Sequence, residues 1–233
     1  MPRFANSNET QGSLRWYYYR DASIGQNTVI IDGANQRVDT TPISTFGTSG
    51  TQQGSAPNYD AALNTTTGAN STAFFTTDLT TAYTDGATSF KRGIRMVNSR
   101  RQILLQDEIT ATASVNWRMH TNATVVIDTA GGNKTATLTL NGQTLIATIL
   151  SPSAATFSTT LPLRLPSMPL LPGGGLGEDA DQFNAGVTVL EITLPGGQYS
   201  IQVDFQPVWP GLSASDYTTP PSVALADWSL TSH

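Results

Sequence analysis

The sequence contains no cysteine and few charged residues. Of its 233 residues none is Cys, and only 12% are Asp, Glu, Lys or Arg, against about 25% in an average domain. The lack of cysteine excludes disulfide bonds, cysteine nucleophiles and cysteine-ligated metals. A chain of this length can bury a full core without such cross-links.

Long apolar runs and a signal-peptide pattern are also missing. No apolar run reaches bilayer-spanning length, and the N-terminal MPRFANSNET lacks the apolar core of a secretory signal. The net charge of −5 argues against nucleic acid and membranes as partners. N-x-S/T sequons nevertheless favour a secreted or extracellular location; they start at Asn8, Asn64, Asn70, Asn122 and Asn133.

Helix-type periodicity is absent, whereas strand-like segments recur along the chain. No segment of about a dozen residues repeats apolar side chains at helical spacing. Apolar runs at 28–32, 102–109 and 123–128 are typical of strands. We therefore predict an all-β fold, an antiparallel two-sheet β-sandwich of about a dozen strands.

Two turn sequences lie between pairs of apolar runs. Asn141-Gly142 separates the alternating runs 135–140 and 144–150, which predicts a hairpin with a type I′ turn. Pro195–Gly197 separates two further apolar runs and predicts a second strand pair.

Two segments have the composition of long loops. Residues 40–72 are rich in Gly, Ser, Thr and Asn, and residues 162–186 are rich in Pro and Gly with an acidic tip. Loops of such length in a compact domain are usually functional or mobile.

The whole chain, 1–233, is predicted to be a single β-sandwich domain. The core spans about residues 12–209, and residues 210–233 form a proline-rich tail. Trp209 and Trp228 are expected to pack this tail on the body, because large apolar rings favour burial.

An aromatic segment, RWYYYR at 15–20, precedes the first apolar run. In a strand, Tyr17 and Tyr19 would point to one side and Trp16, Tyr18 and Arg20 to the other. The segment is interpreted as the aromatic opening strand of the sandwich. The alternatives are a sugar-stacking face or a tyrosine base whose pKa a nearby cation lowers from about 10.

His120 is the only histidine before the C-terminal residue. Strand-type alternation over 115–120 places Trp117 on one face and Arg118 and His120 on the other. One internal histidine excludes a metal site built on imidazoles, so no metal is expected and Asp78 and His120 are only weak ligand candidates. No G-x-S-x-G motif supports a serine nucleophile.

Half of the twelve basic residues fall within a short part of the sequence. They are Lys91, Arg92, Arg95, Arg100, Arg101 and Arg118. The cluster is either a solvated hairpin or a groove for an anionic glycan, since arginine binds carboxylates and sulfates through paired hydrogen bonds.

An ordered series of segments resembles a known family. The segments are RWYYYR followed by GQNTVIIDGANQ, then AFFTTDLTTAY, FKRGIRMVNSRRQILLQDEITATASVNWRMHTNATV and GVTVLEITLPGGQYSIQVDFQPVW. Together, over about residues 12–209, they resemble the C-terminal β-sandwich domain of fungal heparinase II/III-like polysaccharide lyases.

The resemblance implies a two-part enzyme, of which this chain matches one part. In that family a helical toroid carries the tyrosine and histidine that perform β-elimination on a uronic acid, and the β-sandwich closes one side of the cleft. Some relatives also hold a structural zinc near the domain junction. Asn27, Asp78 and His120 match family positions, whereas Gln26 stands where many relatives have histidine.

Three functions remain open. The first is a non-catalytic, lectin-like protein that binds an oligo- or polysaccharide, acidic or neutral; the missing toroid favours it. The second is a fragment or reduced form of a lyase, and the third is an oligomeric structural or interaction protein, because a surface covered in relatives would be exposed and favour a homo-oligomer. No cofactor is expected. The candidate glycan-binding residues are Tyr17, Tyr19, Arg20, Asn27, Lys91, Arg92, Arg95, Arg118 and His120.

Overall fold

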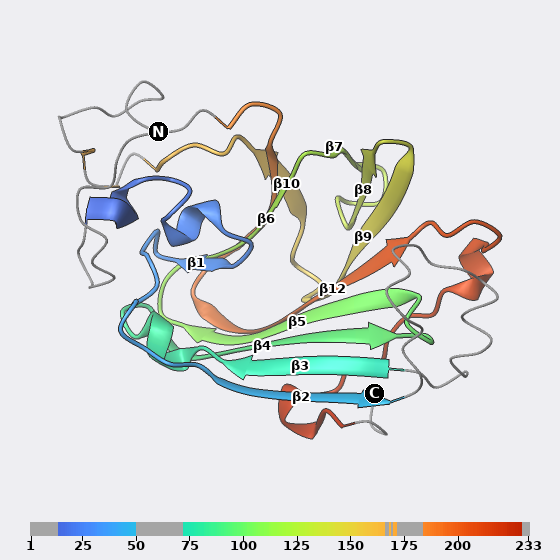
Figure 1. The fold of residues 1–233 in the computed structure, drawn as a ribbon, viewed down its shortest axis with the longest axis horizontal. Helices are drawn as coiled ribbons and strands as arrows, with labels where there is room; N and C mark the ends of the chain where they lie inside the picture. Colours follow the sequence, from blue (N-terminus) through green and yellow to red (C-terminus); the bar gives the residue numbers. More distant parts are fainter. Residues whose placement is uncertain (1–13, 50–71, 166–167, 169, 172–183, 230–233) are drawn as a thin grey trace.

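The computed structural model describes residues 14–49, 72–165, 168, 170–171 and 184–229. Within these residues two antiparallel sheets pack face to face, as Figure 1 shows. The predicted all-β, two-sheet sandwich is confirmed, with twelve strands in the described part of the chain. None of the helices in that part is both long and apolar enough to cross a membrane.

The small sheet has four strands and the large sheet has eight. In spatial order the small sheet contains β1 (Val29–Ile31), β6 (Val115–Thr121), β11 (Thr188–Leu194) and β10 (Phe157–Thr160). The large sheet contains β2 (Ile43–Ser49), β3 (Thr72–Asp78), β4 (Ala87–Val97), β5 (Gln102–Ala111), β12 (Gly197–Pro207), β9 (Gln143–Ser151), β8 (Thr135–Leu140) and β7 (Thr124–Ile127). Short 3₁₀ helices are η1 (Leu14–Tyr17), η2 (Ser23–Gly25), η3 (Thr80–Tyr83), η4 (Ala214–Asp216) and η5 (Leu225–Asp227).

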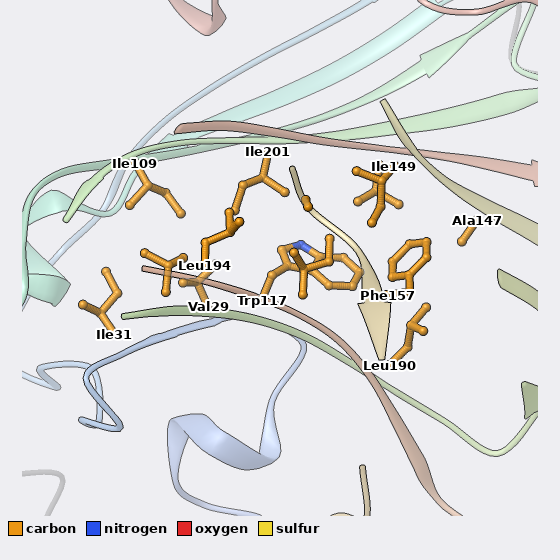
Figure 2. Packing of buried hydrophobic residues seen from close by; sticks show 14 of the residues in the cluster. Val29, Ile31, Ile109, Trp117, Ala147, Ile149, Phe157, Leu190, Leu194 and Ile201 are labelled. Carbon is orange, nitrogen blue, oxygen red and sulfur yellow. The ribbon is translucent and has the colours of Figure 1, made fainter. Parts of the chain in front are cut away.

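The main core lies between the two sheets. Trp117 and Leu190 of the small sheet point toward Ile201 and Ile149 of the large sheet, and Phe157 packs beside them (Figure 2). Trp117 is only 1% exposed. Since full burial of one such apolar side chain contributes about 1.5–3 kcal/mol, this layer fixes how the two sheets face each other.

The Asn141-Gly142 hairpin is confirmed. Strands β8 and β9 pair in register up to Leu140 and Gln143. Asn141 has φ 50° and Gly142 has φ 77°, which are the positive values that a type I′ turn requires at both central residues.

The two strands predicted on either side of Pro195–Gly197 are present as β11 and β12, but their predicted pairing with each other is wrong. Strand β11 pairs with β6 and β10 in the small sheet, whereas β12 pairs with β5 and β9 in the large sheet. The turn therefore links the two sheets. A Cβ on Gly196 would lie 2.8 Å from the Thr112 carbonyl oxygen, so glycine is required here by close backbone packing rather than by a hairpin.

The predicted loop at 40–72 contains a strand. Residues Ile43–Ser49 form β2, an edge strand paired along its length with β3. The segment is polar and Ile43 is 77% exposed, so the sequence lacks the apolar alternation that identifies a strand. Residues 50–71 lie outside the described residues, as does the acidic tip of the loop predicted at 162–186.

The prediction that residues 15–20 form an aromatic opening strand is also wrong. Leu14–Tyr17 is a 3₁₀ helix followed by turns, in which the Ala22 amide donates to the Tyr18 carbonyl. Tyr19 is buried with Ala22 and Ile24 in a small cluster outside the small sheet. The rings' preference for strands is overridden because this segment packs across a sheet face rather than along an edge.

Candidate binding site on the outer face of the small sheet

The outer face of the small sheet carries polar side chains from two paired strands. Trp117 points into the core, while Arg118 points outward beside Glu191, its partner in register on β11. The alternation predicted for residues 115–120 is thus confirmed. Asn116 and Thr193 form the next outward pair along the same two strands.

Tyr19, His120 and Asn27 form a hydrogen-bonded chain on this face. The Tyr19 hydroxyl lies 2.7 Å from His120 Nε2, and His120 Nδ1 lies 3.2 Å from Asn27 Oδ1. Arg118 Nη2 donates to the Tyr19 oxygen at 3.3 Å. Because a guanidinium only donates and an amide oxygen only accepts, Tyr19 donates to Nε2 and the histidine proton lies on Nδ1.

Arg118 forms the buried centre of the site. Its Nη1 donates to Glu191 Oε2 at 3.0 Å and to Asn116 Oδ1 at 2.9 Å. The side chain is 5% exposed, and its Nε is buried without a hydrogen-bond partner. Arg118 therefore joins Glu191, Asn116 and Tyr19 on this face.

Burial favours the neutral forms of both Tyr19 and His120. Burial raises the pKa of Tyr19, although the hydrogen bond and charge of Arg118 partly oppose the shift. Burial, followed by the positive charge of Arg118, lowers the pKa of His120 to about 4. A tyrosine base needs the opposite shift from the one that burial gives Tyr19.

A pocket of about 340 Å³ opens next to Arg118. It is lined by outward-facing residues of the small sheet and by Leu161, Leu163 and Arg164, here called its rim. The lining residues are Ile24, Ile30, Gly33, Ser114, Asn116, Arg118, Thr160, Leu161, Leu163, Arg164, Leu165, Glu191 and Thr193. We call this the sheet pocket.

Residues distant in the sequence hold the rim of the sheet pocket. Arg164 Nε donates to the Tyr17 carbonyl at 3.0 Å. Arg20 Nε donates to Asn184 Oδ1 at 2.6 Å, and the Asn184 amide donates to the Pro162 carbonyl at 3.2 Å. Two of the predicted residues, Tyr17 and Arg20, thus help to position the rim.

The basic residues predicted as one groove are divided between the two sheets. Arg118 lies in the small sheet, whereas Lys91, Arg92 and Arg95 lie on β4 of the large sheet, and none of these three lines the sheet pocket. Arg92 donates to both carboxylate oxygens of Asp107 at 2.7 Å each.

Arg92 is connected to the site through Asn27. Its Nη1 donates to the Asn27 carbonyl at 2.8 Å, while the Asn27 side chain accepts the His120 backbone amide at 2.8 Å. The buried ion pair on the large sheet therefore holds the main chain that orients His120.

Sequence reasoning missed Glu191, Arg164 and Asn184. Glu191 could have been found from its place in the alternating run VTVLEITL, where it is the one charged outward residue. No local pattern identifies Arg164 or Asn184, because each acts through a contact made across the fold.

The weak metal candidates do not form a metal site. Asp78 Oδ1 accepts the Thr80 amide at 3.0 Å, and both ring nitrogens of His120 are engaged with Tyr19 and Asn27. Among the described residues no three His, Asp or Glu side chains gather closely enough to hold an ion. These residues therefore do not fit the structural zinc of the resembling family.

No protein-family model and no curated protein matches this chain. Solved structures do match. The chain is similar to the heparan sulfate lyase HepC from Pedobacter heparinus, with a TM-score of 0.53 and 11% identity over 90% of this chain. It is also similar to a heparinase III, the BT4657 gene product, with a TM-score of 0.51 and 13% identity over 82% of this chain.

These likenesses concern the fold. The chain covers 28% of the first lyase and 25% of the second, so it spans about a quarter of their length. At such identities the comparison shows a heparinase-like β-sandwich, which confirms the architecture that the resemblance implied. It does not transfer catalytic residues.

Proposed function

We propose that this chain is a non-catalytic, carbohydrate-binding β-sandwich protein whose ligand site is the sheet pocket. The observation that carries the proposal is a pocket of about 340 Å³ whose lining combines Arg118, Glu191, Asn116 and Thr193 with the partly exposed side chains of Leu161 and Leu163. Such a lining, a few polar groups among apolar side chains, is typical of small-molecule sites.

The chemistry of the sheet pocket suits a sugar. Asn116, Thr193 and Glu191 present both donors and acceptors from a rigid sheet, as the hydroxyl groups of a saccharide require. Leu161 and Leu163, 65% and 46% exposed, offer apolar surface at the rim to the C–H faces of the ring.

An acidic oligosaccharide fits better than a neutral one. The charged residues that the structure describes in the lining are Arg118, Arg164 and Glu191, and two of these three are arginines. A carboxylate or sulfate of the ligand would gain a charge-assisted hydrogen bond from an arginine. An extracellular location, suggested by the sequons, agrees with such a ligand.

Isothermal calorimetry with uronic-acid-containing and neutral oligosaccharides tests the proposal. We expect binding of the acidic ligand, weakened about tenfold or more by Arg164→Gln, which corresponds to about 1.4 kcal/mol. Lys91→Gln, on the large sheet, is the matched control and should leave affinity unchanged. Absence of binding at millimolar ligand, or an equal effect of both variants, would reject the proposal.

A second role, self-association, is favoured by an uncovered part of the large sheet. Phe75, Ile94, Leu105, Val203 and Ile149 are successive cross-strand partners and therefore lie on one face. Val203 is fully buried in the core, but Phe75 and Ile94 are each 40% exposed. The core-facing side of the large sheet thus extends past the edge of the small sheet. We propose that a second copy of the protein covers this exposed part.

A further inference from the structure

A second pocket lies away from the sheet pocket. It is formed by the β8–β9 hairpin, the connection between β6 and β7, and the residues at the end of β12. Its volume is about 340 Å³, and none of the described residues that line it also lines the sheet pocket. We call it the hairpin pocket, and it is a separate space from the proposed glycan site.

The wall of the hairpin pocket continues the core-facing side of the large sheet. Leu138 on β8 is the cross-strand partner of Leu145 on β9, which in turn is the partner of Pro207 on β12. Directly opposite residues on paired strands lie on the same face. Leu138 is 4% exposed and belongs to the main core, and Leu145 packs against that core. The pocket is therefore an open end of the apolar interior.

Two partly exposed apolar side chains gather at this pocket. Leu140 and Val208 both line it, and each is 46% exposed. Leu140 lies two residues beyond Leu138, so it points to the same face of β8, and the turn at Asn141-Gly142 holds it opposite Gln143. A ligand that covered these side chains would remove apolar area from water, which favours binding.

Trp209 forms a fixed aromatic part of the lining. Its Nε1 donates to the Arg101 carbonyl at 3.0 Å, and its backbone amide donates to the Tyr217 hydroxyl at 3.3 Å. The neighbouring Val208 amide donates to the Thr144 carbonyl at 2.9 Å. These contacts hold the end of β12 in place, so little ordering of the protein opposes binding.

The polarity of the lining restricts the ligand. Among the lining residues that the structure describes none is charged, and the polar side chains are those of Thr121, Gln143 and Thr144. Thr121 Oγ1 accepts the Ala123 amide at 3.0 Å, and Gln143 is exposed. An ionised group placed against such a lining would lose hydration without gaining a counter-charge. The pocket therefore suits an uncharged ligand, in contrast to the arginine-containing sheet pocket.

We propose that the hairpin pocket binds a small uncharged molecule with an apolar body and one polar end. The body lies against Leu140, Leu145 and Trp209, and the polar end lies at Gln143. One water occupies about 30 Å³ in the liquid, so the pocket has room for roughly ten non-hydrogen atoms. Its volume also reaches the lower end of the range for small-molecule sites, about 300–1,000 Å³. This site does not depend on glycan binding at the sheet pocket.

Nuclear magnetic resonance titration of the full chain with 3-phenylpropan-1-ol tests the proposal. We expect saturable shifts concentrated on the Ala123 and Val208 amides and the Trp209 indole N–H, with a dissociation constant of about a millimolar or below. Titration with 1-octanol distinguishes an aromatic from an alkyl ligand body, since the better fit should bind more tightly. Methyl glucoside, a polar ring of comparable size, should not compete with either alcohol.

Variants on the two pockets provide matched controls. Leu140→Asn should weaken binding of 3-phenylpropan-1-ol about tenfold or more, because it removes apolar contact area. Leu161→Asn makes the same change at a 65% exposed residue that lines the sheet pocket, and it should bind like the wild type. Val208→Thr keeps a similar shape while adding a hydroxyl, so it guards against misfolding and should weaken binding about threefold.

Four results would each overturn the proposal. They are a lack of saturable shifts with both alcohols, shifts centred on residues outside the hairpin pocket, equal weakening by Leu161→Asn, and competition by methyl glucoside. The last result would instead indicate a second sugar site.

Discussion

The hydroxyl of Tyr19 lies 2.7 Å from Nε2 of His120, although 101 residues separate them in the sequence. Tyr19 follows the 3₁₀ helix η1 and is buried in a small cluster outside the small sheet, and His120 lies near the end of β6. The pair joins this N-terminal segment to the sheet, and the Arg118 donor on the same hydroxyl fixes which atom carries each proton.

The first prediction concerns the pH dependence of stability. Burial and Arg118 lower the pKa of His120 from 6.5 to about 4, so the unfolded state takes up this proton at a higher pH than the folded state. The free energy of unfolding should therefore fall as pH falls from about 6.5 toward 4. Above about pH 6.5, where His120 is neutral in both states, it should no longer depend on His120 protonation. Urea unfolding across this range measures the trend.

A His120→Gln variant is the control for that trend. It should flatten the part of the profile between about pH 6.5 and 4.5, because residue 120 then no longer gains a proton on unfolding. Burial raises the pKa of Asp204, which contributes with the opposite sign, and this contribution is present in both proteins. Identical profiles for the two proteins would contradict the prediction.

The second prediction separates binding from β-elimination. Tyr19 has a raised pKa and both His120 nitrogens are hydrogen-bonded, so neither is arranged to abstract a proton at neutral pH. Incubation with uronic-acid-containing polysaccharides should produce no unsaturated product absorbing in the ultraviolet. Product formation that Tyr19→Phe abolishes would instead support a reduced lyase.

The third prediction concerns the buried ion pair. Asp107 is fully buried and Arg92 is 11% exposed. Asp107→Leu alone leaves Arg92 without its counter-charge and should cost about 3–5 kcal/mol of unfolding free energy in urea titrations. The double variant Arg92→Met, Asp107→Leu should recover most of this loss. A double variant no more stable than the single one would show that the lost stability has another cause.

The fold class could be predicted from the sequence because its signals are local. The alternation over 115–120 assigned Trp117 to the core and Arg118 to the outer face, and Asn141-Gly142 fixed one hairpin. Partner choice is not local, and the same apolar alternation in β11 and β12 is compatible with one sheet or two. The turn between them lies against the backbone of Thr112 at Gly196, a contact that no sequence periodicity reports.

The candidate site was only partly predictable for the same reason. Tyr19, Arg118 and His120 were identified by residue type, but their meeting depends on the 3₁₀ helix that replaced the expected strand. Arg92 and Arg95 were grouped with Arg118 because they are close in sequence. The fold instead pairs Arg92 with Asp107 and places Arg95 against Trp228.

The fourth prediction tests self-association through the uncovered row on the large sheet. Phe75 and Ile94 are cross-strand partners, each 40% exposed, at the end of a row whose other members reach the core. If a second copy covers them, wild-type protein should show more than the monomer mass in light scattering at high concentration. The double variant Phe75→Thr, Ile94→Thr should shift it toward the monomer, because threonine keeps strand propensity while removing apolar area.

A matched control distinguishes this surface from general hydrophobicity. Val126, on the far edge strand β7, is 62% exposed, so Val126→Thr removes apolar surface outside the row and should leave the mass unchanged. Because Phe75 and Ile94 are partly exposed, their replacement should cost less stability than a core truncation of about 2–5 kcal/mol, and the variant stays folded. A monomeric wild-type protein, or equal dissociation by Val126→Thr, would mean that this face is simply solvated and that contact between copies, where it occurs, uses another surface.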